Sequence, residues 1–195
     1  MKPVGADHGL AIRDARPEDM SAVQTIYAHH VRNGLASFEE QPPDVAEIIR
    51  RFEVTVGAGY PFLVAEAATG PVVGYAYAGC YRSRPAYRHT VETSLYIAEE
   101  HRGQGIGRRL LEALITRCEA LGYRQMVAVI GDSGNTASIG LHESLGFTRI
   151  GTLVAAGFKF NRWVDSVYMQ RPLGSGDTAP PEPRDRRPDA TPSPR

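Results

Sequence analysis

Apolar residues recur along the chain with two periods, and each period predicts one kind of element. Apolar positions three and four residues apart are typical of helices with one buried face, whereas alternation or a short apolar run is typical of strands. The helical spacing predicts helices over residues 17–31, 44–57, 105–121 and 136–145. The strand pattern predicts strands over residues 10–15, 61–67, 72–81, 91–98, 125–130, 147–156 and 163–171.

Proline, glycine and aspartate mark several of these boundaries. Pro17 suits the first turn of the first helix, and Gly34 ends it. Asp44 can cap the second helix, which ends near Gly57 and Gly59. The boundaries therefore agree with the periods.

The order of the predicted elements is β-α-α-β-β-β-α-β-α-β-β, with a Thr69-Gly70-Pro71 turn joining the second and third strands as a hairpin. A single sheet covered by helices accommodates this order, and no internal repeat is evident. The sequence therefore predicts a mixed α/β domain.

Length and composition restrict the chain to one folded domain. A chain of 195 residues with 42% apolar residues can bury one substantial core. The stretch from Gly174 to Arg195 contains six prolines and no Leu, Ile, Val or aromatic residue, so it buries too little to offset the entropy of ordering. We expect a flexible N-terminus at 1–9, one domain at 10–173 and a disordered tail at 174–195.

The charge balance argues against several classes of partner. Lys and Arg number 22, equal to Asp and Glu, so the whole molecule has no electrostatic reason to bind nucleic acid or an anionic membrane. No apolar run is long enough to span a membrane, and the N-terminus lacks a secretory signal. We expect a soluble, cytoplasmic protein in which Cys80 and Cys118 are reduced core or near-core thiols, with no ligand spacing for a metal.

Three glycines from Gly103 to Gly107 lie directly before the 105–121 helix, which has no Ser or Asp to cap it. Bare main-chain amides at a helix N-terminus can hold an anion, and Arg102, Arg108 and Arg109 add positive charge. A flexible turn before a helix is the alternative. The spacing fits neither the P-loop nor the dinucleotide fingerprint.

The residues "RGQGIG" at 102–107, together with the element order, resemble the acetyl-CoA pyrophosphate loop of the GCN5-related N-acetyltransferase (GNAT) family. The resemblance implies the GNAT fold, an α/β fold with a mixed, mostly antiparallel sheet splayed at its middle and flanked by helices. In this family the main chain of the strand before the loop pairs with the pantetheine arm. The implied acetyl-CoA contacts are Leu95, Tyr96, Ile97, Arg102, Gly103, Gln104, Gly105, Ile106, Gly107, Arg108, Asn135 and Ser138.

Four further segments are similar to the phosphinothricin and methionine sulfoximine N-acetyltransferases within that family. They are "ASFEEQPP" at 36–43, "RSRPAYRHTVETSLYI" at 82–97, "NTASIGLHESLGF" at 135–147 and "GFKFNRW" at 157–163. The similarity implies an acyltransferase that moves acetyl to the α-amine of a small amino acid by direct attack in a ternary complex, and a homodimer. The implied substrate-binding residues are Phe38, Arg82, Arg84, Tyr87, Glu92, His142 and Lys159.

Alternation along the 91–98 strand places Glu92 on the face opposite Val91 and Thr93. Glu92 is the candidate general base, because the amine must lose a proton before it attacks. A carboxylate is a weak base for this step, so we expect either a pKa raised by burial or relay through water. A solvent-facing charge or an ion pair is the alternative.

The remaining candidates each have a structural alternative. Arg82 and Arg84 can present donor forks to an anionic substrate, or lie in a solvated loop. Asn135 can cap the following helix and also bind cofactor, and His142 can pack rather than contact substrate. That helix contains no Tyr to act as general acid, so solvent can protonate the leaving thiolate.

Two other functions remain open from the sequence. The same domain can acetylate another metabolite amine or a protein N-terminus, or it can be a non-catalytic sensor that binds coenzyme A. The physiological substrate stays undefined, because acetylation of a herbicide can be incidental to a detoxification role.

Overall fold

A computed structural model describes residues 9–68 and 70–182. Its strands are β1 (Ala11–Asp14), β2 (Phe62–Glu66), β3 (Val72–Cys80), β4 (Thr90–Ile97), β5 (Gln125–Gly131), β6 (Thr148–Lys159) and β7 (Arg162–Pro172). Its helices are α1 (Met20–Asn33), α2 (Val45–Gly57), α3 (Ile106–Ala120) and α4 (Thr136–Ser144), with 3-10 turns η1 (Pro17–Asp19), η2 (Pro85–Tyr87) and η3 (Glu99–His101). The predicted order of helices and strands is confirmed.

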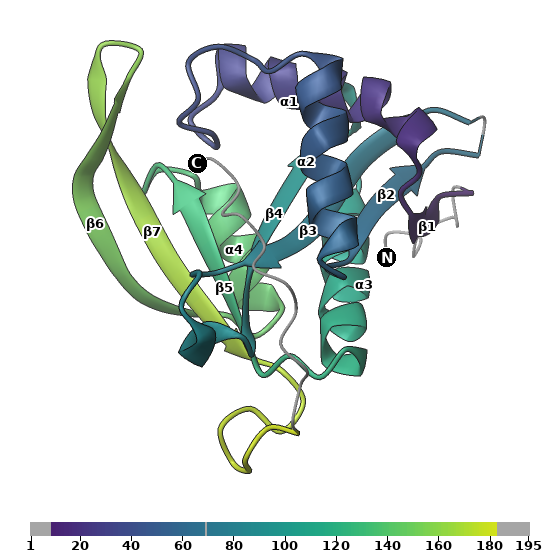
Figure 1. The fold of residues 1–195 in the computed structure, drawn as a ribbon. Helices are drawn as coiled ribbons and strands as arrows, with labels where there is room; N and C mark the ends of the chain where they lie inside the picture. The colour runs from purple at the N-terminus through teal and green to yellow at the C-terminus, as the bar shows by residue number, and fades with distance from the viewer. Residues whose placement is uncertain (1–8, 69, 183–195) are drawn as a thin grey trace, which may run out of the picture.

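The strands form one seven-stranded sheet in the order β1-β2-β3-β4-β5-β7-β6 (Figure 1). Every pair of neighbours is antiparallel except β4 and β5, which are parallel. The predicted fold class, a mixed and mostly antiparallel sheet flanked by helices, is confirmed.

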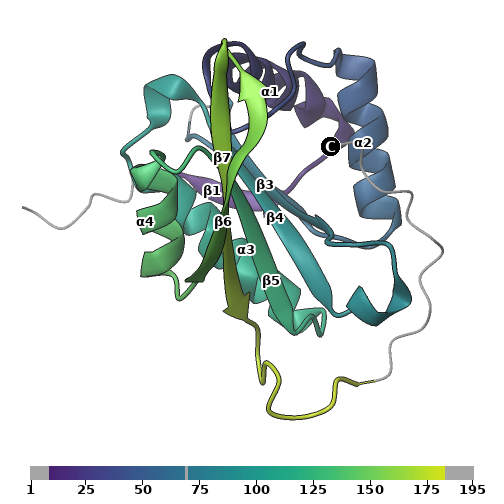
Figure 2. The same ribbon diagram turned by 90° about the vertical axis from the view of Figure 1, so that its left-hand side faces the viewer.

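The two faces of the sheet carry two separate hydrophobic clusters. One cluster joins the sheet to α3 and α4 through side chains such as Leu110, Leu114 and Cys118, all 0% exposed. The other joins it to α1 and α2 through side chains such as Val23 and Phe52. Figures 1 and 2 show these helices around the sheet.

Two of the predicted helix signals act as expected, and one acts differently. Asp44 accepts a hydrogen bond from the Glu47 amide at 2.8 Å and caps α2. Gly34 follows α1 in an extended conformation and ends it. Pro17, however, opens the 3-10 turn η1, and the α-helix itself begins at Met20.

The parallel pairing between β4 and β5 is short. Thr90 to Thr93 pair with Gln125 to Ala128, and no pairing between the two strands follows in the described residues. β5 continues to Gly131 against β7, while β4 continues to Ile97 against β3. The two strands therefore separate at the middle of the sheet, as the family resemblance implies.

The β6–β7 hairpin extends beyond the rest of the sheet and ends in a tight turn (Figures 1 and 2). Lys159 pairs with Arg162, and the two residues between them, Phe160 and Asn161, have φ angles of 51° and 57°. Positive φ at both central positions suits the twist of a hairpin. The predicted strand ends at 156 and 163 missed the outer part of this hairpin because its turn contains no Gly or Pro.

The chain after β7 is held against the core as far as it is described. Leu173 is 0% exposed, and Arg124 donates to the carbonyls of Gly176 and Ala179 at 2.8 and 2.7 Å. The predicted tail at 174–195 falls partly outside the described residues, as does most of the predicted N-terminal segment at 1–9.

Gly131, the last residue of β5, lies against the segment that follows α1. A Cβ atom at Gly131 would overlap the carbonyl oxygen of Leu35 and lie 3.3 Å from the Phe38 ring. Only glycine therefore allows this close approach of two backbones.

We expect Gly131→Ala to lower the free energy of unfolding by about 1–3 kcal/mol, because the added methyl group has no space. Urea denaturation measures the change. Gly140→Ala is the matched control, since a Cβ at this exposed helical position meets nothing within 4 Å. Equal stabilities of the two variants would contradict the close packing of Gly131.

Candidate active site

Two cavities meet where β4 and β5 separate. We call them the α4-side cavity, which Asn135, Ser138 and His142 border, and the acceptor cleft, which residues of α1 and α2 border. Both are lined by Ala36, Thr93, Ser94, Tyr96, Val129 and Gly131. The gap in the sheet therefore connects one face of the molecule with the other.

The register of β4 decides which main-chain groups face this gap. Ala98 donates its amide to the Val73 carbonyl at 2.9 Å. Because direction alternates in an antiparallel ladder, the amides at even positions of β4, including Tyr96, point to β3. Those of Leu95 and Ile97 point toward the gap. The Tyr96 amide is thus directed away from the gap, although the Tyr96 residue lines both cavities.

His30 occupies one of the main-chain acceptors at this edge. Its Nε2 lies 2.9 Å from the carbonyl oxygen of Ile97, so it must donate a proton to that oxygen. Burial lowers the pKa of His30, which favours the neutral ring with its proton on Nε2. The Ile97 amide and both main-chain groups of Leu95 remain directed toward the gap.

The glycine loop lies at the end of β4. A Cβ at Gly107 would meet the Leu95 and Ile97 side chains at 3.6 and 3.8 Å, so the start of α3 packs against the separated end of the strand. Gly103 and Gly105 have φ angles of 71° and 78°, and a Cβ on either would meet nothing within 4 Å. Among the described residues no side chain caps α3. The amides of its first turn lack partners inside the helix, as at any helix N-terminus.

The basic residues around this loop are partly engaged. Arg102 pairs with Glu99 at 2.9 Å, and Arg108 pairs with Glu112 at 2.9 Å. Arg109 donates to the Leu10 carbonyl at 2.8 Å. Arg102 and Arg108 are exposed, and exposed ion pairs contribute little free energy. Either arginine can therefore leave its glutamate and contact an anion at the loop with little loss of stability.

Helix α4 places three polar residues around the α4-side cavity. The Asn135 side chain accepts a hydrogen bond from the Ser138 amide at 3.2 Å, which confirms its predicted cap. His142 is 4% exposed, and its Nδ1 donates to the Ser138 carbonyl at 2.8 Å. Burial lowers the pKa of His142, so the neutral ring keeps Nε2 as an acceptor.

Glu92 lies in the acceptor cleft, which has a volume of about 390 Å³. The alternation predicted for β4 is confirmed: Leu95 and Ile97 pack with the α3 cluster, whereas Tyr96 packs with the α1–α2 cluster. Tyr77 stands opposite Ser94 on β3 and also lines the cleft. A carboxylate and phenol groups thus share one pocket.

The tyrosines of this region stay protonated over the physiological range. Burial raises the pKa values of Tyr27, Tyr75, Tyr77 and Tyr96. Tyr75 stacks with Tyr96 at 5.3 Å between ring centroids, and Tyr27 meets Tyr96 edge to face at 5.2 Å. The cluster gives the cleft a rigid aromatic wall with hydroxyl donors.

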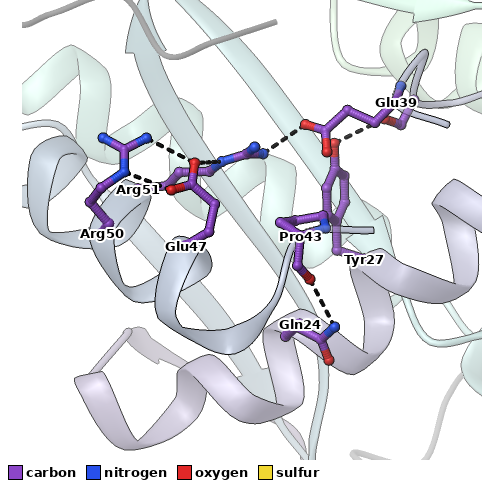
Figure 3. Close-up of polar contacts among 8 residues, drawn as sticks. Gln24, Tyr27, Glu39, Pro43, Glu47, Arg50 and Arg51 are labelled. Atoms are coloured by element: carbon purple, nitrogen blue, oxygen red, sulfur yellow. Dashed lines mark hydrogen bonds and ion pairs between the residues drawn. The ribbon is translucent and has the colours of Figure 1, made fainter. Parts of the chain in front are cut away.

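Charged residues of α2 and of the segment after α1 complete the cleft (Figure 3). Arg51 donates to the Glu39 carboxylate at 2.7 Å and to Glu47 at 2.8 Å. The Tyr27 hydroxyl lies 2.9 Å from Ser37 Oγ. These bonds attach the segment after α1 to both helices.

The structure brings only part of the predicted substrate set into the cleft. Phe38 and Glu92 line it, and His142 lines the α4-side cavity instead. Arg82, Arg84 and Tyr87 are exposed in the loop between β3 and β4 and do not border either cavity. Arg82 lies over the Tyr81 ring at 5.2 Å.

Lys159, also in the predicted set, does not line the cleft. It is 4% exposed, and its Nζ donates to the carbonyls of Gly34 and Ser37 at 3.0 and 2.7 Å. A contact from Lys159 to substrate therefore remains a prediction, whereas its contact with the segment after α1 is a feature of the fold.

Several cleft residues were not predicted from the sequence: Tyr27, Ser37, Glu39, Arg51, Tyr77 and Tyr168. Arg51 directly precedes the buried Phe52 on α2, and nothing in the sequence pattern indicates that its charge faces the cleft. Among residues 9–68 and 70–182, no group of three His, Cys, Asp or Glu is placed to hold a metal. Nor does any helix in these ranges have the length and apolarity needed to cross a membrane.

Comparisons with known proteins show which family the chain is similar to. The family model described as an acetyltransferase (GNAT) domain matches residues 12–168. The chain is 56% identical over 171 residues to a phosphinothricin N-acetyltransferase of Alcaligenes faecalis, covering 88% of this chain and 86% of that protein. It is 44% identical to a methionine sulfoximine and methionine sulfone acetyltransferase of Pseudomonas aeruginosa, covering 87% and 98%.

A solved structure is similar over most of its length. The crystal structure of a phosphinothricin acetyltransferase from Sinorhizobium meliloti in complex with acetyl-CoA is 48% identical, with a TM-score of 0.86. The match covers 89% of this chain and 93% of that chain.

The two buried histidines predict a loss of stability in acid. Burial lowers the pKa of His30 and His142 from the ordinary value of 6.5, so the unfolded chain binds protons more readily than the folded one. We expect the free energy of unfolding to be fully retained above pH 6.5 and to fall as the pH drops below it. Urea denaturation between about pH 5 and 8 measures this slope around the ordinary histidine pKa. A slope that persists in a His30→Gln, His142→Gln double variant would assign it to other groups.

Proposed function

The chain belongs to the GNAT acetyltransferase family, and from this premise we propose that it transfers acetyl from acetyl-CoA to the α-amine of a small amino acid such as methionine sulfoximine or phosphinothricin. The observation that carries the proposal is the meeting of the two cavities at the gap between β4 and β5. A donor on one face and an acceptor on the other can react there directly in a ternary complex.

Two parts of the chain support binding of acetyl-CoA in this proposal. The separated edge at Leu95 and Ile97 supplies main-chain groups for an extended amide-bearing arm, and the open loop at 102–108 supplies amides for a diphosphate. Asn135 and Ser138 border the α4-side cavity, which the Leu95 edge also lines. When bound, acetyl-CoA supplies the thioester whose acetyl group is transferred.

Glu92 has two roles in this proposal. Its carboxylate holds the ammonium group of the acceptor in the cleft, and it takes up the proton that the amine must lose, directly or through water. Loss of the ammonium proton costs about 1.4 kcal/mol for each unit by which the pKa of the amine exceeds the pH. A base held beside the amine can take up that proton directly or through one water.

The main chain of β4 supplies the donor for the carbonyl oxygen on which negative charge develops. The Ile97 and Leu95 amides face the gap, whereas the Tyr96 amide bonds toward β3. We therefore assign this role to the odd-numbered amides alone. Neutral His142 offers only the acceptor Nε2, so we assign protonation of the leaving sulfur to solvent.

The charged lining of the cleft suits a zwitterionic amino acid. Its charged residues are Glu39, Arg51 and Glu92, and the first two pair with each other. Glu92 can direct its carboxylate to the ammonium group, while Arg51 can share its guanidinium fork with the substrate carboxylate. The exposed Arg82 and Arg84 remain candidates for a second anion at the rim.

A substrate panel tests the proposal. Purified protein is incubated with acetyl-CoA and methionine sulfoximine, phosphinothricin or a peptide with a free N-terminus, and the liberated thiol is titrated. We expect thiol release with the first two and the larger kcat/KM for them. Preference for the peptide would favour a protein N-acetyltransferase, and no release with any amine would favour a sensor.

Glu92→Gln provides the matched test of the mechanism. We expect kcat to fall about 100-fold or more, the scale of general acid–base contributions, while calorimetry gives an unchanged affinity for acetyl-CoA. An unchanged kcat would remove Glu92 from the role of base.

We further propose that the chain forms a homodimer through the β6–β7 hairpin. β6 is an edge strand, and the hairpin exposes large apolar side chains, among them Val154 at 78% and Trp163 at 66%. An exposed apolar edge strand is a common site of self-association. The same region carries Phe158 and Phe160, both more than half exposed.

We expect sedimentation equilibrium to give twice the mass of the chain. Val154→Lys should shift the equilibrium toward the monomer, because it places a charge in the apolar patch. Glu112→Lys, on the exposed side of α3, is the control and should remain dimeric. A monomeric parent protein would contradict the dimer without affecting the assignment of Glu92.

A further inference from the structure

Residues 34–39, here called the acceptor loop, form one wall of the acceptor cleft. Ala36, Ser37, Phe38 and Glu39 all line the cleft, and Ala36 also borders the α4-side cavity. The loop has no regular secondary structure. Its position must therefore be set by contacts with other elements.

Two of these contacts come from α1 and α2, and both bind side chains of the loop. Tyr27 meets the Ser37 hydroxyl at 2.9 Å, and Arg51 meets the Glu39 carboxylate at 2.7 Å. Figure 3 shows Tyr27, Glu39 and Arg51 together at this wall. Neither contact provides a hydrogen bond to the main-chain carbonyls of the loop, so these need a donor from another element.

The β6–β7 hairpin supplies the missing partner, more than 120 positions away in the sequence. Lys159 donates to the Gly34 carbonyl at 3.0 Å and the Ser37 carbonyl at 2.7 Å. Its ammonium also lies 4.9 Å from the Phe160 ring centroid. Two carbonyls and an aromatic face thus surround the charge.

Burial of the Lys159 ammonium costs free energy unless its hydrogen bonds to the loop form at the same time. Lys159 is 4% exposed and has no carboxylate within ion-pair distance in the described residues. A buried ammonium requires strong hydrogen-bond partners, and the two carbonyls can provide them only when the loop has this shape. The lysine and the loop therefore fix each other.

Gly157 supports the same contact two residues earlier on β6. A Cβ at Gly157 would lie 2.5 Å from the Phe38 ring. The bare glycine allows Phe38 to rest on the hairpin while the same residue lines the acceptor cleft. The hairpin thus determines where both Ser37 and Phe38 lie.

We propose that Lys159 is a positioning residue that fixes the acceptor loop from the β6–β7 hairpin and thereby sets the affinity for the amine substrate. This inference rests on the proposed acetyltransferase function and deepens it. It differs from direct binding of substrate by Lys159, because the ammonium uses its donors on the loop and lies outside the lining of the cleft.

The two roles predict different responses to substrate charge. A lysine that binds substrate directly should matter more for phosphinothricin, which carries an anionic phosphinate, than for methionine sulfone, whose side chain is neutral. A positioning lysine should affect both acceptors alike, because it shapes the wall that both contact. The ratio of the two KM changes therefore separates the roles.

The experiment uses the full chain and Lys159→Met, which keeps the length of the side chain. We expect KM for both acceptors to rise by about tenfold and by similar factors, with a much smaller change in kcat, because acceptor binding is weakened and the reacting groups remain. The affinity for acetyl-CoA by calorimetry should stay within about twofold, which also shows that the variant is folded.

Gly157→Ala tests the same inference without removing a charge. It should displace Phe38 and reproduce the rise in acceptor KM with unchanged affinity for acetyl-CoA. Arg149→Met, which removes an exposed cation from the other end of the hairpin, is the control. It should leave the acceptor KM and the affinity for acetyl-CoA unchanged.

Three outcomes would overturn the inference. They are an unchanged acceptor KM in Lys159→Met, a rise confined to phosphinothricin, or an equal loss of acetyl-CoA affinity. Failure of the parent protein to acetylate either amino acid would instead reject the proposed function, so the two failures are distinguishable.

Discussion

The short parallel pairing between β4 and β5 is the constraint on which the rest of the structure depends. Backbone N–H and C=O groups inside a sheet are normally hydrogen-bonded to neighbouring strands. Here β4 stays with β3 and β5 stays with β7, so beyond Thr93 and Ala128 the facing groups have no strand to bond within residues 9–68 and 70–182. An unpaired strand edge inside a sheet is costly to maintain, and the fold retains it by packing Leu95 and Ile97 against α3.

The gap between β4 and β5 opens to both faces of the sheet, and the two faces carry different candidate groups. The α3–α4 face carries the glycine loop, the capped helix α4 and the neutral His142. The α1–α2 face carries Glu92, the tyrosine cluster and the Arg51–Glu39 pair. In the proposed function the acetyl donor and the amine approach from separate sides of the sheet, which allows both to be bound at once.

The sequence predicts local features well because their causes are local. Apolar periods located the helices and strands, the side chains of Asp44 and Asn135 cap the helices that follow them, and alternation placed Glu92 on the face that holds the cleft. The anion-binding role of the loop at 102–107 rests on three glycines and an arginine in one short stretch, and it stays a prediction.

Features that depend on tertiary contacts could not be predicted in the same way. Arg51 lies in an amphipathic helix like any surface arginine, and only the fold brings it to Glu39. Lys159 was assigned to substrate from a short motif, but its partners are carbonyls, which have no side-chain signature in a sequence. The outer part of the β6–β7 hairpin was missed because Phe160 and Asn161 adopt positive φ without glycine.

The assembly of the acceptor cleft from distant segments has a consequence for how such an enzyme can diverge. The wall formed by α1, α2 and the acceptor loop carries Tyr27, Arg51 and Glu39, whereas the proposed coenzyme contacts lie mostly on β4, the glycine loop and α4. Under the proposed function, substitutions in this wall can therefore change the accepted amine while most of the coenzyme contacts stay in place.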